Sequence, residues 1–548
     1  MTKDKRALPR PKNAVSVALD RIGGDRPVTV ALFLLLAGLL IVIARFLWCN
    51  VWLTLNADEA SEMVLAKLLA DEGSILSKNW YYSTELRVLN TNPIYALFFR
   101  LTDDWLSVRV FSTVTMIVLL LAAYFFMTWA WRIRTRYAAL FSLMLVIPFS
   151  ESYHTIVLRG AYYLPHITIT FFTIGLAGLF VRQKRGGAIA AAAASAVLAV
   201  LAGMGGPRQI LVLYLPLLAA AAVGFALNRE NEQKSHLLFA ALSFGGSVIG
   251  YAVNVLLLSR IYTFKDWEIL FTGFRFSRLE QLICGIINVF GYTEGKVFSF
   301  ALVKNFIAGV WVLLTLFLIV HAVKNRKTAA RGYVVLALFT AAAYLIFSLL
   351  YLFTDMLYAD RYWLPLTVMS FPLAAAFVSE YGPKLRLLRL SAAAFVALCC
   401  LRGMAYYYRQ WGDDQTKGLR QLAAVAVDEG YTAGYASFWR ANVMIELSNG
   451  RIDMYDWCDS GSSEDLWGIP DVDQTYSWLQ AKSHDTERPS GRVFLLMTRT
   501  EAQKNHWRSN LHDEDLLFSS EFYVAYGYPD YDTMLSVLYR GKEAPAGG

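Results

Sequence analysis

The chain has 548 residues, of which 56% are hydrophobic and only 17% are charged, and its mean hydropathy is +0.40. Soluble domains average roughly 45–50% apolar and about 25% charged residues, so the composition argues against a cytosolic enzyme, a disordered chain or a nucleic-acid-binding domain. The formal net charge is +8, but the cations cluster in short gaps between apolar runs. That distribution is typical of topology signals, and the sequence therefore predicts a multi-pass membrane protein without a nucleic-acid partner.

Apolar runs long enough to cross a bilayer core of about 30 Å follow one another along the chain. We expect about eleven transmembrane spans, near 28–51, 107–130, 137–150, 161–181, 188–205, 210–227, 237–258, 297–323, 332–353, 362–381 and 390–406. The third and fifth runs are short, which indicates a tilted or broken span. Residues 1–27 form a basic tail, and we expect no cleaved leader because the first apolar run is too long for one.

The charges of the loops indicate which end of each span faces the cytoplasm. One set of alternate gaps carries groups of Lys and Arg, at 3–26, 132–136, 182–185, 229–234, 324–331 and 384–389. The short gaps assigned to the opposite side carry single cations, namely Arg159, Arg208 and Arg361. The positive-inside rule therefore predicts a cytoplasmic N-terminus in the cell membrane, and an odd number of spans places the C-terminal segment outside.

The expected fold class is an all-α membrane domain over 28–408 followed by a small extracytoplasmic α/β domain over 409–548. The first outer loop, 54–105, is expected to hold short helices. In the C-terminal domain, strand-like segments alternate with helix-like ones. The predicted strands are 432–437, 451–457, 492–497 and 533–539, and the predicted helices are 418–429 and 438–447. The five cysteines show neither disulfide nor metal-ligand spacing.

Three carboxylates open the first outer loop: Asp58, Glu59 and Glu62, in the stretch LNADEASEM. Asp58 and Glu62 are four residues apart, so a helix places both on one face. A carboxylate fixed at a membrane mouth is well placed to act as a general base on a hydroxyl group. The alternative is structural, because a polar residue at Asn56 or Asp58 suits a helix N-cap and nearby acids suit the helix dipole.

Two outer segments are rich in groups that stack on or hydrogen-bond to small polar ligands. Tyr81 and Tyr82 lie in the first outer loop, and Glu151, His154 and Tyr163 lie in the connection ESYHTIVLRGAYYLPH. We assign these five residues to an acceptor- or sugar-binding site. Aromatic rings at a membrane surface also serve as interface anchors, and a buried histidine also serves in packing, so these alternatives stay open.

Arg159, Arg208 and Arg361 each lie at a different outer mouth, and Tyr362 follows the last of them. The planar guanidinium donates two parallel hydrogen bonds, which suits a phosphate group. An ionisable group at the end of a span is a functional candidate by default. We therefore predict that these residues converge on one phosphate. Snorkelling of each arginine to the interface is the alternative.

Four short motifs occur in a set order. They are Asp58-Glu59-Ala60, Asn92-Pro93-Ile94-Tyr95, the entry 107–109 to the second span, and Arg361-Tyr362-Trp363-Leu364-Pro365. With these motifs the chain resembles the C-type glycosyltransferases (GT-C fold), in particular the protein O-mannosyltransferases and the lipid A aminoarabinose transferases. The second motif departs from the Pro-Pro-Leu-Tyr of that family, because Asn92 replaces the first proline.

The resemblance implies a membrane glycosyltransferase that uses a polyprenyl-phosphate sugar and an extracytoplasmic acceptor, which is a lipid, a glycan or a protein hydroxyl. It implies Asp58 as the base, Glu59 or Glu62 as an orienting carboxylate, and Arg361 as the principal phosphate ligand. Arg159 and Arg208 would be secondary cations. No cofactor is expected, and the metal-binding signature of oligosaccharyltransferases is not visible in the sequence.

Two other functions remain as alternatives. A polysaccharide polymerase or ligase of the O-antigen type also has many spans and outer arginines, but such proteins usually place their large outer loop late in the chain. A flippase or transporter of lipid-linked sugars would need polar groups near the middle of its spans. The spans here are rich in Ala, Leu, Val and Phe at their centres, and their polar residues concentrate at the outer ends.

Overall fold

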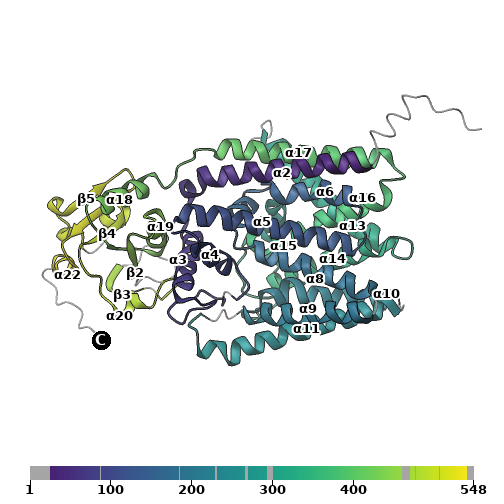
Figure 1. Cartoon of the computed structure of the whole chain (residues 1–548), viewed down its shortest axis with the longest axis horizontal. Helices are drawn as coiled ribbons and strands as arrows, with labels where there is room; N and C mark the ends of the chain where they lie inside the picture. The colour runs from purple at the N-terminus through teal and green to yellow at the C-terminus, as the bar shows by residue number, and fades with distance from the viewer. Residues whose placement is uncertain are drawn as a thin grey trace, which may run out of the picture.

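The computed structural model describes residues 25–86, 88–183, 185–228, 231–265, 269–292, 300–459, 470–475, 477–504 and 507–539. The molecule is elongated: long helices run side by side, and a domain with a β-sheet lies at one end of this bundle (Figure 1). We call the end of the bundle next to this domain the domain end, and the opposite end the far end.

Among the described residues, ten helices are long and apolar enough to cross a membrane, or eleven if one bent pair counts as a span. The predicted number of about eleven spans is therefore confirmed. The helices of these ten spans are α2 (Asp25–Asn50), α5 (Trp105–Ala130), α8 (Leu164–Arg182), α9 (Arg185–Met204), α10 (Leu215–Leu227), α11 (Asn231–Leu256), α13 (Phe300–Lys324), α14 (Arg331–Phe353), α15 (Leu364–Val368) with α16 (Ser370–Tyr381), and α17 (Arg386–Gln410). A shorter helix, α12 (Leu279–Val289), precedes α13.

The third predicted span is the broken one. It begins with α6 (Thr135–Ser142), and after a bend of 87° it continues as Glu151–Arg159, with α7 (Glu151–Tyr153) as its first turn. Pro148 lies at the break, and Ile147 before it is extended at φ −121° and ψ 145°. A proline has no N–H for the helix and disfavours helical backbone in the residue before it, which accounts for the bend.

Glycines let α9 and α11 approach each other very closely. A Cβ atom on Gly203 would lie 2.1 Å from the carbonyl oxygen of Ser247, and one on Gly250 would lie 2.0 Å from that of Val200. Side chains do not fit at such distances, so only glycine permits this crossing. Close packing of small residues is a usual source of association between helices in a membrane.

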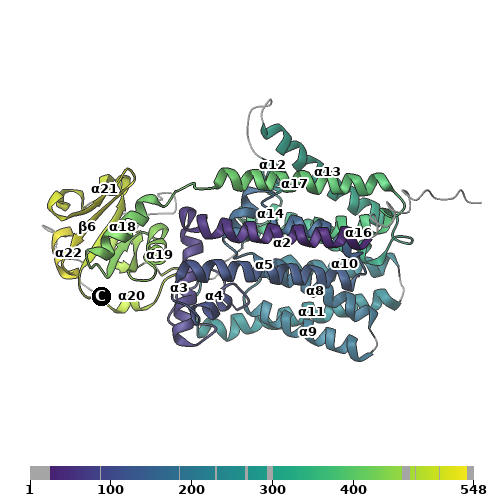
Figure 2. The same cartoon turned by 45° about the horizontal axis from the view of Figure 1, so that its top comes forward.

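The first outer loop forms two helices, α3 (Ala57–Glu72) and α4 (Asn92–Phe99), as predicted. The residue before α3, Asn56, is extended, and its side chain accepts a hydrogen bond from the N–H of Glu59 at 3.0 Å. Helix α3 ends at Gly73, which has φ +65° and donates its N–H to the carbonyl of Ala70. Both helices lie at the domain end of the bundle (Figure 2).

The C-terminal domain has a sheet of six strands in the order β3-β2-β1-β4-β6-β5, in which β1 is parallel to β2 and β4 and the other neighbours are antiparallel. The strands are β1 (Ala433–Ala436), β2 (Asp453–Asp459), β3 (Pro470–Thr475), β4 (Val493–Thr498), β5 (Leu516–Ser519) and β6 (Tyr523–Tyr528). The helices are α18 (Lys417–Asp428), α19 (Phe438–Leu447), α20 (Ser483–Thr486), α21 (Arg499–Lys504) and α22 (Tyr531–Leu538). The predicted α/β class of this domain is confirmed.

The predicted strand 533–539 is wrong, because this segment belongs to the helix α22. Asp530 caps the helix by accepting the N–H of Thr533 at 2.7 Å. The buried residues Tyr531, Met534 and Leu538 recur at intervals of three and four, which is the period of a helix face packed on a sheet.

Candidate active site

A cavity of about 380 Å³ lies at the domain end of the bundle, and both the bundle and the C-terminal domain contribute to its wall. Its lining comes from α3, the loop that precedes α4, the first turn of α8 and the connection before it, the segment after α11, the connections that precede α10 and α15, and the C-terminal domain. The lining residues are Asp58, Glu62, Ser83, Thr84, Glu85, Asn90, Tyr162, Tyr163, His166, Arg208, Lys265, Arg361, Tyr362, Trp478 and Leu479. We call this space the Asp58 cavity.

Asp58 and Glu62 lie one turn apart on α3, and both line the Asp58 cavity, as their spacing predicts. Asp58 is exposed, and its carboxylate accepts no hydrogen bond from any residue that the structure describes. Asn56 is the residue that caps the helix, so Asp58 is not needed for that role. Glu62 is buried at the edge of the cavity and accepts a hydrogen bond from the Thr91 hydroxyl at 2.6 Å.

Glu59 points away from the cavity, because successive residues of a helix are about 100° apart around its axis. Its side chain is fully buried, and its Oε1 accepts hydrogen bonds from Arg159 Nη2 at 2.8 Å and from Arg159 Nε at 3.1 Å. Asn56 Nδ2 donates to the same oxygen at 2.9 Å. Arg159 is thus held in a buried ion pair behind the first turn of α3 and does not line the cavity, in contrast to the predicted convergence of three arginines.

A second buried ion pair joins the C-terminal domain to the bundle. Arg109 of α5 donates from Nε and Nη2 to the two carboxylate oxygens of Glu446 on α19, each at 2.5 Å. Arg109 Nη2 also donates to the carbonyl of Glu59 at 2.8 Å, and the indole of Trp52 donates to Glu446 at 3.1 Å. Burial raises the pKa of Glu446, and the adjacent guanidinium opposes this rise. The pair therefore fixes the backbone that carries Asp58.

The two arginines in the cavity differ in their partners. Arg208 Nε lies 2.7 Å from Glu85 Oε1, and its guanidinium lies 5.2 Å from the ring centre of Tyr163. Arg361 makes no ion pair with a carboxylate in the described part of the chain, and its guanidinium lies 5.5 Å from the ring centre of Tyr362. Of the three arginines that the sequence singles out, Arg361 is thus the one whose charge is not neutralised by a described neighbour.

Tyr162 lies close enough to both Asp58 and Arg361 to be affected by both charges. Burial raises the pKa of this phenol, the negative charges of Glu59 and Asp58 raise it further, and the positive charge of Arg361 opposes them. Tyr162 lines the cavity beside its neighbour Tyr163. The cavity thus combines a carboxylate and a guanidinium group with aromatic walls.

Four residues that we assigned to acceptor or sugar binding do not line the Asp58 cavity. Tyr81 hydrogen-bonds to Asp485 in the C-terminal domain, and the hydroxyl of the buried Tyr82 accepts the N–H of Ser77 at 2.9 Å. The remaining two lie on the bent third span. His154 is buried, packs on the ring of Phe46 at 5.5 Å and contacts the Tyr406 hydroxyl at 3.4 Å, whereas Glu151 is exposed. The ring of His154 thus serves in packing, which was the structural alternative.

The cavity also contains residues that the sequence did not single out. Glu85 neutralises Arg208, and Lys265 lies with its Nζ 5.2 Å from the ring centre of Trp478. His166 contacts the amide nitrogen of Gln209 through Nδ1 at 2.7 Å. Glu85, Lys265 and Trp478 lie in irregular segments, and His166 lies in the first turn of α8. No repeating pattern marks these residues, so only the density of polar and aromatic residues in the outer loops pointed to them.

An apolar groove meets the Asp58 cavity at Asn90, which lines both. The groove measures about 210 Å³ and runs between α4, α5 and the start of α8. Its other lining residues are Val88, Leu89, Pro93, Ile94, Met116, Leu119, Leu164, Pro165, Thr168 and Ile169. Leu119 is 46% exposed, so the groove connects the polar cavity with the apolar outer surface of the bundle.

Within the part of the chain that the structure describes, no group of three or more His, Cys, Asp or Glu side chains is arranged to hold a metal ion. The absence of a metal from the reaction itself stays a prediction.

No family model and no curated protein matches the chain. Among solved structures, it is similar to ArnT from Cupriavidus metallidurans in the apo state, with a TM-score of 0.56, 12% identity, and coverage of 90% of this chain and 97% of that one. The same protein bound to undecaprenyl phosphate aligns with a TM-score of 0.51 and 13% identity, with the same coverage of both chains. An oligosaccharyltransferase from Archaeoglobus fulgidus aligns over 76% of this chain and 63% of that one, with a TM-score of 0.44 and 11% identity.

The chain therefore has the GT-C fold, the fold of a class of membrane glycosyltransferases, as the sequence motifs predicted.

Proposed function

We propose that this protein is a membrane glycosyltransferase that moves a sugar from a polyprenyl-phosphate donor to an acceptor hydroxyl on the extracytoplasmic side. The observation that carries this proposal is the pairing within one cavity of a carboxylate, Asp58, with a cation, Arg361, neither of which has an ion-pair partner among the described residues. Arg208, the other arginine that lines the cavity, is paired with Glu85, and Arg159 is paired with Glu59 outside the cavity.

The chemistry follows from these two charges. Asp58 takes the proton of the acceptor hydroxyl while the oxygen attacks the anomeric carbon of the sugar. The bond between that carbon and the phosphate oxygen breaks, and the polyprenyl phosphate leaves as an anion. Arg361 lies where this negative charge develops and stabilises it. A single displacement of this kind inverts the anomeric configuration and requires no covalent enzyme intermediate.

The apolar groove supports a lipid-linked donor. A polyprenyl chain is long and apolar, so its phosphate must be bound at the interface while its tail remains in a hydrophobic environment. The groove at Ile94 and Leu119 leads from the apolar surface of the bundle to Asn90 at the cavity wall. The similar ArnT structure with bound undecaprenyl phosphate supports the same class of donor.

The orientation in the membrane is part of the proposal. The far end carries the loops rich in Lys and Arg, such as 132–136, 324–331 and 384–389, which favours the cytoplasm for this end. The Asp58 cavity and the C-terminal domain then face the extracytoplasmic side of the cell membrane.

The proposal is tested with the full chain in lipid nanodiscs. A panel of polyprenyl-phosphate sugars is supplied with total membrane lipid and envelope glycan as acceptors, and mass spectrometry follows the released polyprenyl phosphate and the glycosylated product. We expect release with wild type and a loss of at least tenfold in kcat/KM with Arg361→Gln, because a charge-assisted contact to phosphate is lost. The exposed Arg100→Gln, outside the cavity, is the matched control.

Other outcomes would contradict the proposal. Movement of the donor across the bilayer without cleavage of its sugar–phosphate bond would establish a transporter. Turnover only with a diphosphate-linked glycan would favour a polymerase or ligase.

A further inference from the structure

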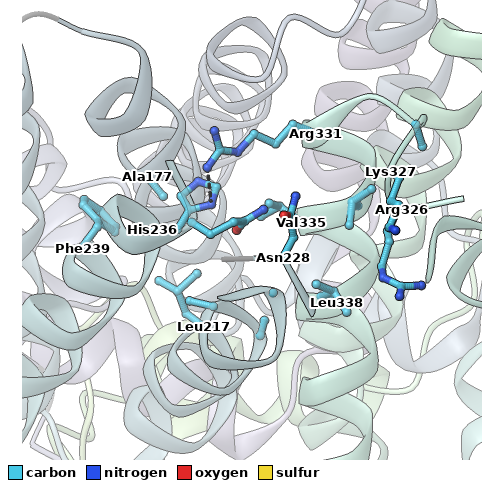
Figure 3. A pocket seen from close by; sticks show the side chains of 16 residues that line it. Ala177, Leu217, Asn228, His236, Phe239, Arg326, Lys327, Arg331, Val335 and Leu338 are labelled. Carbon is cyan, nitrogen blue, oxygen red and sulfur yellow. Dashed lines mark hydrogen bonds between the residues drawn. The ribbon is translucent and has the colours of Figure 1, made fainter. Parts of the chain in front are cut away.

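Two smaller cavities contain buried polar side chains that the proposed reaction does not use. One, of about 200 Å³, lies at the far end of the bundle between α10, α11 and α14. There Arg331 is directed toward His236, whereas Arg326 and Lys327 point away from this pair (Figure 3). These charged groups therefore do not surround one position. The other cavity adjoins the Asp58 cavity, and its polar groups lie closer together.

This second space is a pocket of about 20 Å³ on the side of α8 and α9. It shares four lining residues with the Asp58 cavity, namely Glu85, Asn90, His166 and Arg208. The rest of its wall comes from the first outer loop, from α8, and from the end of α9 with the connection that follows it. These residues are Leu86, Leu89, Ile169, Ala202, Gly205, Gly206 and Gln209. We call this space the side pocket.

Gln209 is the polar residue that lines the side pocket but not the Asp58 cavity. It is 4% exposed, and its Nε2 lies 2.7 Å from Nδ1 of His166. Its Oε1 is buried and has no hydrogen-bond partner among the described residues. Buried polar atoms in folded proteins are nearly always hydrogen-bonded, so this oxygen indicates that a hydrogen-bond donor enters the side pocket.

Two glycines form part of the pocket wall with their backbone. Gly206 has φ +129°, a conformation that residues with a side chain rarely adopt, and a Cβ atom on it would lie 3.6 Å from Cγ of Glu85. A Cβ atom on Gly205 would lie 3.3 Å from the carbonyl oxygens of both Ala202 and Leu86. The side pocket is thus bounded by closely packed backbone, which limits the size of the group that it admits.

The volume and the charge of the side pocket select that group. About 10–15 Å³ is enough for one water molecule, so the pocket admits one hydroxyl or amino group but not the bulkier acetamido group. Glu85 Oε1 lies 2.7 Å from Arg208 Nε, so the carboxylate in the lining is already neutralised. Burying an uncompensated charge is costly, which favours a neutral hydroxyl over an ammonium group.

We propose that the side pocket binds one hydroxyl group of the donor sugar, which donates its hydrogen bond to Gln209 Oε1. This inference rests on the proposed function, because it places the sugar of the polyprenyl-phosphate donor in the Asp58 cavity. Gln209 then determines specificity. A sugar that lacks this hydroxyl leaves the buried oxygen unsatisfied, and a sugar with an acetamido group at the same position does not fit. The substrate class is a sugar with an unsubstituted hydroxyl at that ring position.

The test compares donor analogues with the full chain in lipid nanodiscs. For each polyprenyl-phosphate sugar that wild type uses, analogues that lack one hydroxyl, or carry an amino or acetamido group in its place, are compared by kcat/KM. We expect one ring position at which removal of the hydroxyl, or its replacement by acetamido, lowers kcat/KM of wild type at least tenfold. Gln209→Leu is similar in size but has no acceptor, so removal of the same hydroxyl should change its kcat/KM by less than about threefold. The exposed Gln183→Leu at the far end is the matched control and should discriminate as wild type does.

A second variant keeps the test valid if Gln209→Leu fails to fold. Ala202→Val adds methyl groups at the wall of the side pocket, so its dependence on the same hydroxyl should fall as well. The inference is overturned if the folded variants keep the wild-type dependence on every hydroxyl, or if wild type prefers an amino or acetamido group at the position that depends on Gln209. Failure of the proposed function is distinguishable, because wild type then releases polyprenyl phosphate from none of the donors, and the inference fails with it.

Discussion

Arg109 and Glu446 form a two-point ion pair although they lie 337 residues apart in the chain. Both side chains are almost fully buried, with exposures of 1% and 0%. The same guanidinium donates to the carbonyl of Glu59, the residue after Asp58. The C-terminal domain is thus connected through one cation to the first turn of α3, which carries the proposed base.

We expect the Arg109–Glu446 pair to contribute more to the free energy of unfolding than an exposed ion pair of the C-terminal domain does. Glu446→Ala leaves Arg109 buried and uncompensated, which typically costs about 3–5 kcal/mol. We expect a large fall in the thermal unfolding midpoint of the purified protein. Glu429→Ala, which removes an exposed partner of Arg492, should cost at most about 1 kcal/mol. Equal effects of the two variants would show that the buried pair contributes no more than a surface contact.

We expect the Glu59–Arg159 pair to affect catalysis indirectly, because it holds the first turn of α3 and so positions Asp58. Glu59→Gln keeps a hydrogen-bond acceptor but leaves the charge of Arg159 uncompensated behind the first turn of α3. A small displacement of a reacting group costs roughly 10²-fold in rate, so we expect kcat to fall about tenfold to a hundredfold with little change in the donor KM. The double variant Glu59→Gln/Arg159→Met removes the unpaired charge and should recover part of kcat. A large rise in the donor KM instead would place Glu59 in substrate binding.

Filling the apolar groove should obstruct the donor lipid. Ile94→Trp places an indole in the groove beside Asn90, so we expect a rise of at least tenfold in the KM for the polyprenyl donor with a nearly unchanged kcat. Leu97→Trp, on the same helix but outside the groove and 57% exposed, is the control. If the two variants have the same KM, the tail does not occupy this groove.

Removal of divalent cations should leave the transfer rate unchanged. The sequence shows no metal-binding signature, and the proposed step relies on Asp58 and Arg361. We therefore expect equal initial rates with and without excess EDTA after dialysis. A loss of activity that Mg²⁺ or Mn²⁺ restores would show that a metal ion takes part.

Much of the fold could be predicted because a helix that crosses a bilayer needs about 20 consecutive, mostly apolar residues. Uninterrupted apolar runs identify the spans, and Pro148 within a short run accounts for the broken one. The C-terminal domain was harder, because short segments carry weak periodicity. Residues 533–539 form a short apolar segment with Thr, Val and Tyr, residue types that favour a strand, but the cap at Asp530 and the spacing of Met534 and Leu538 select a helix.

The candidate site could be predicted in part, because charged and aromatic residues at the outer ends of spans are unusual, and Arg208, Arg361, Tyr163 and Tyr362 from such positions line the Asp58 cavity. The spacing of Asp58 and Glu62 on a helix places both side chains in one cavity. The same helix turns Glu59 toward Arg159, a partner 100 residues away that no local pattern reveals. Trp478 reaches the cavity from the C-terminal domain, which only the folded chain brings beside the first outer loop.

The most direct test of the account is the rate of sugar transfer by Asp58→Asn in nanodiscs, measured with saturating polyprenyl-phosphate sugar. The asparagine is isosteric but does not accept the proton of the acceptor, so we predict that kcat falls about 10²–10⁴-fold while the donor still binds. Asp71→Asn, an exposed position on the same helix paired with Lys67, should retain the wild-type rate. A rate for Asp58→Asn equal to that of Asp71→Asn would contradict the assignment of Asp58 as the base.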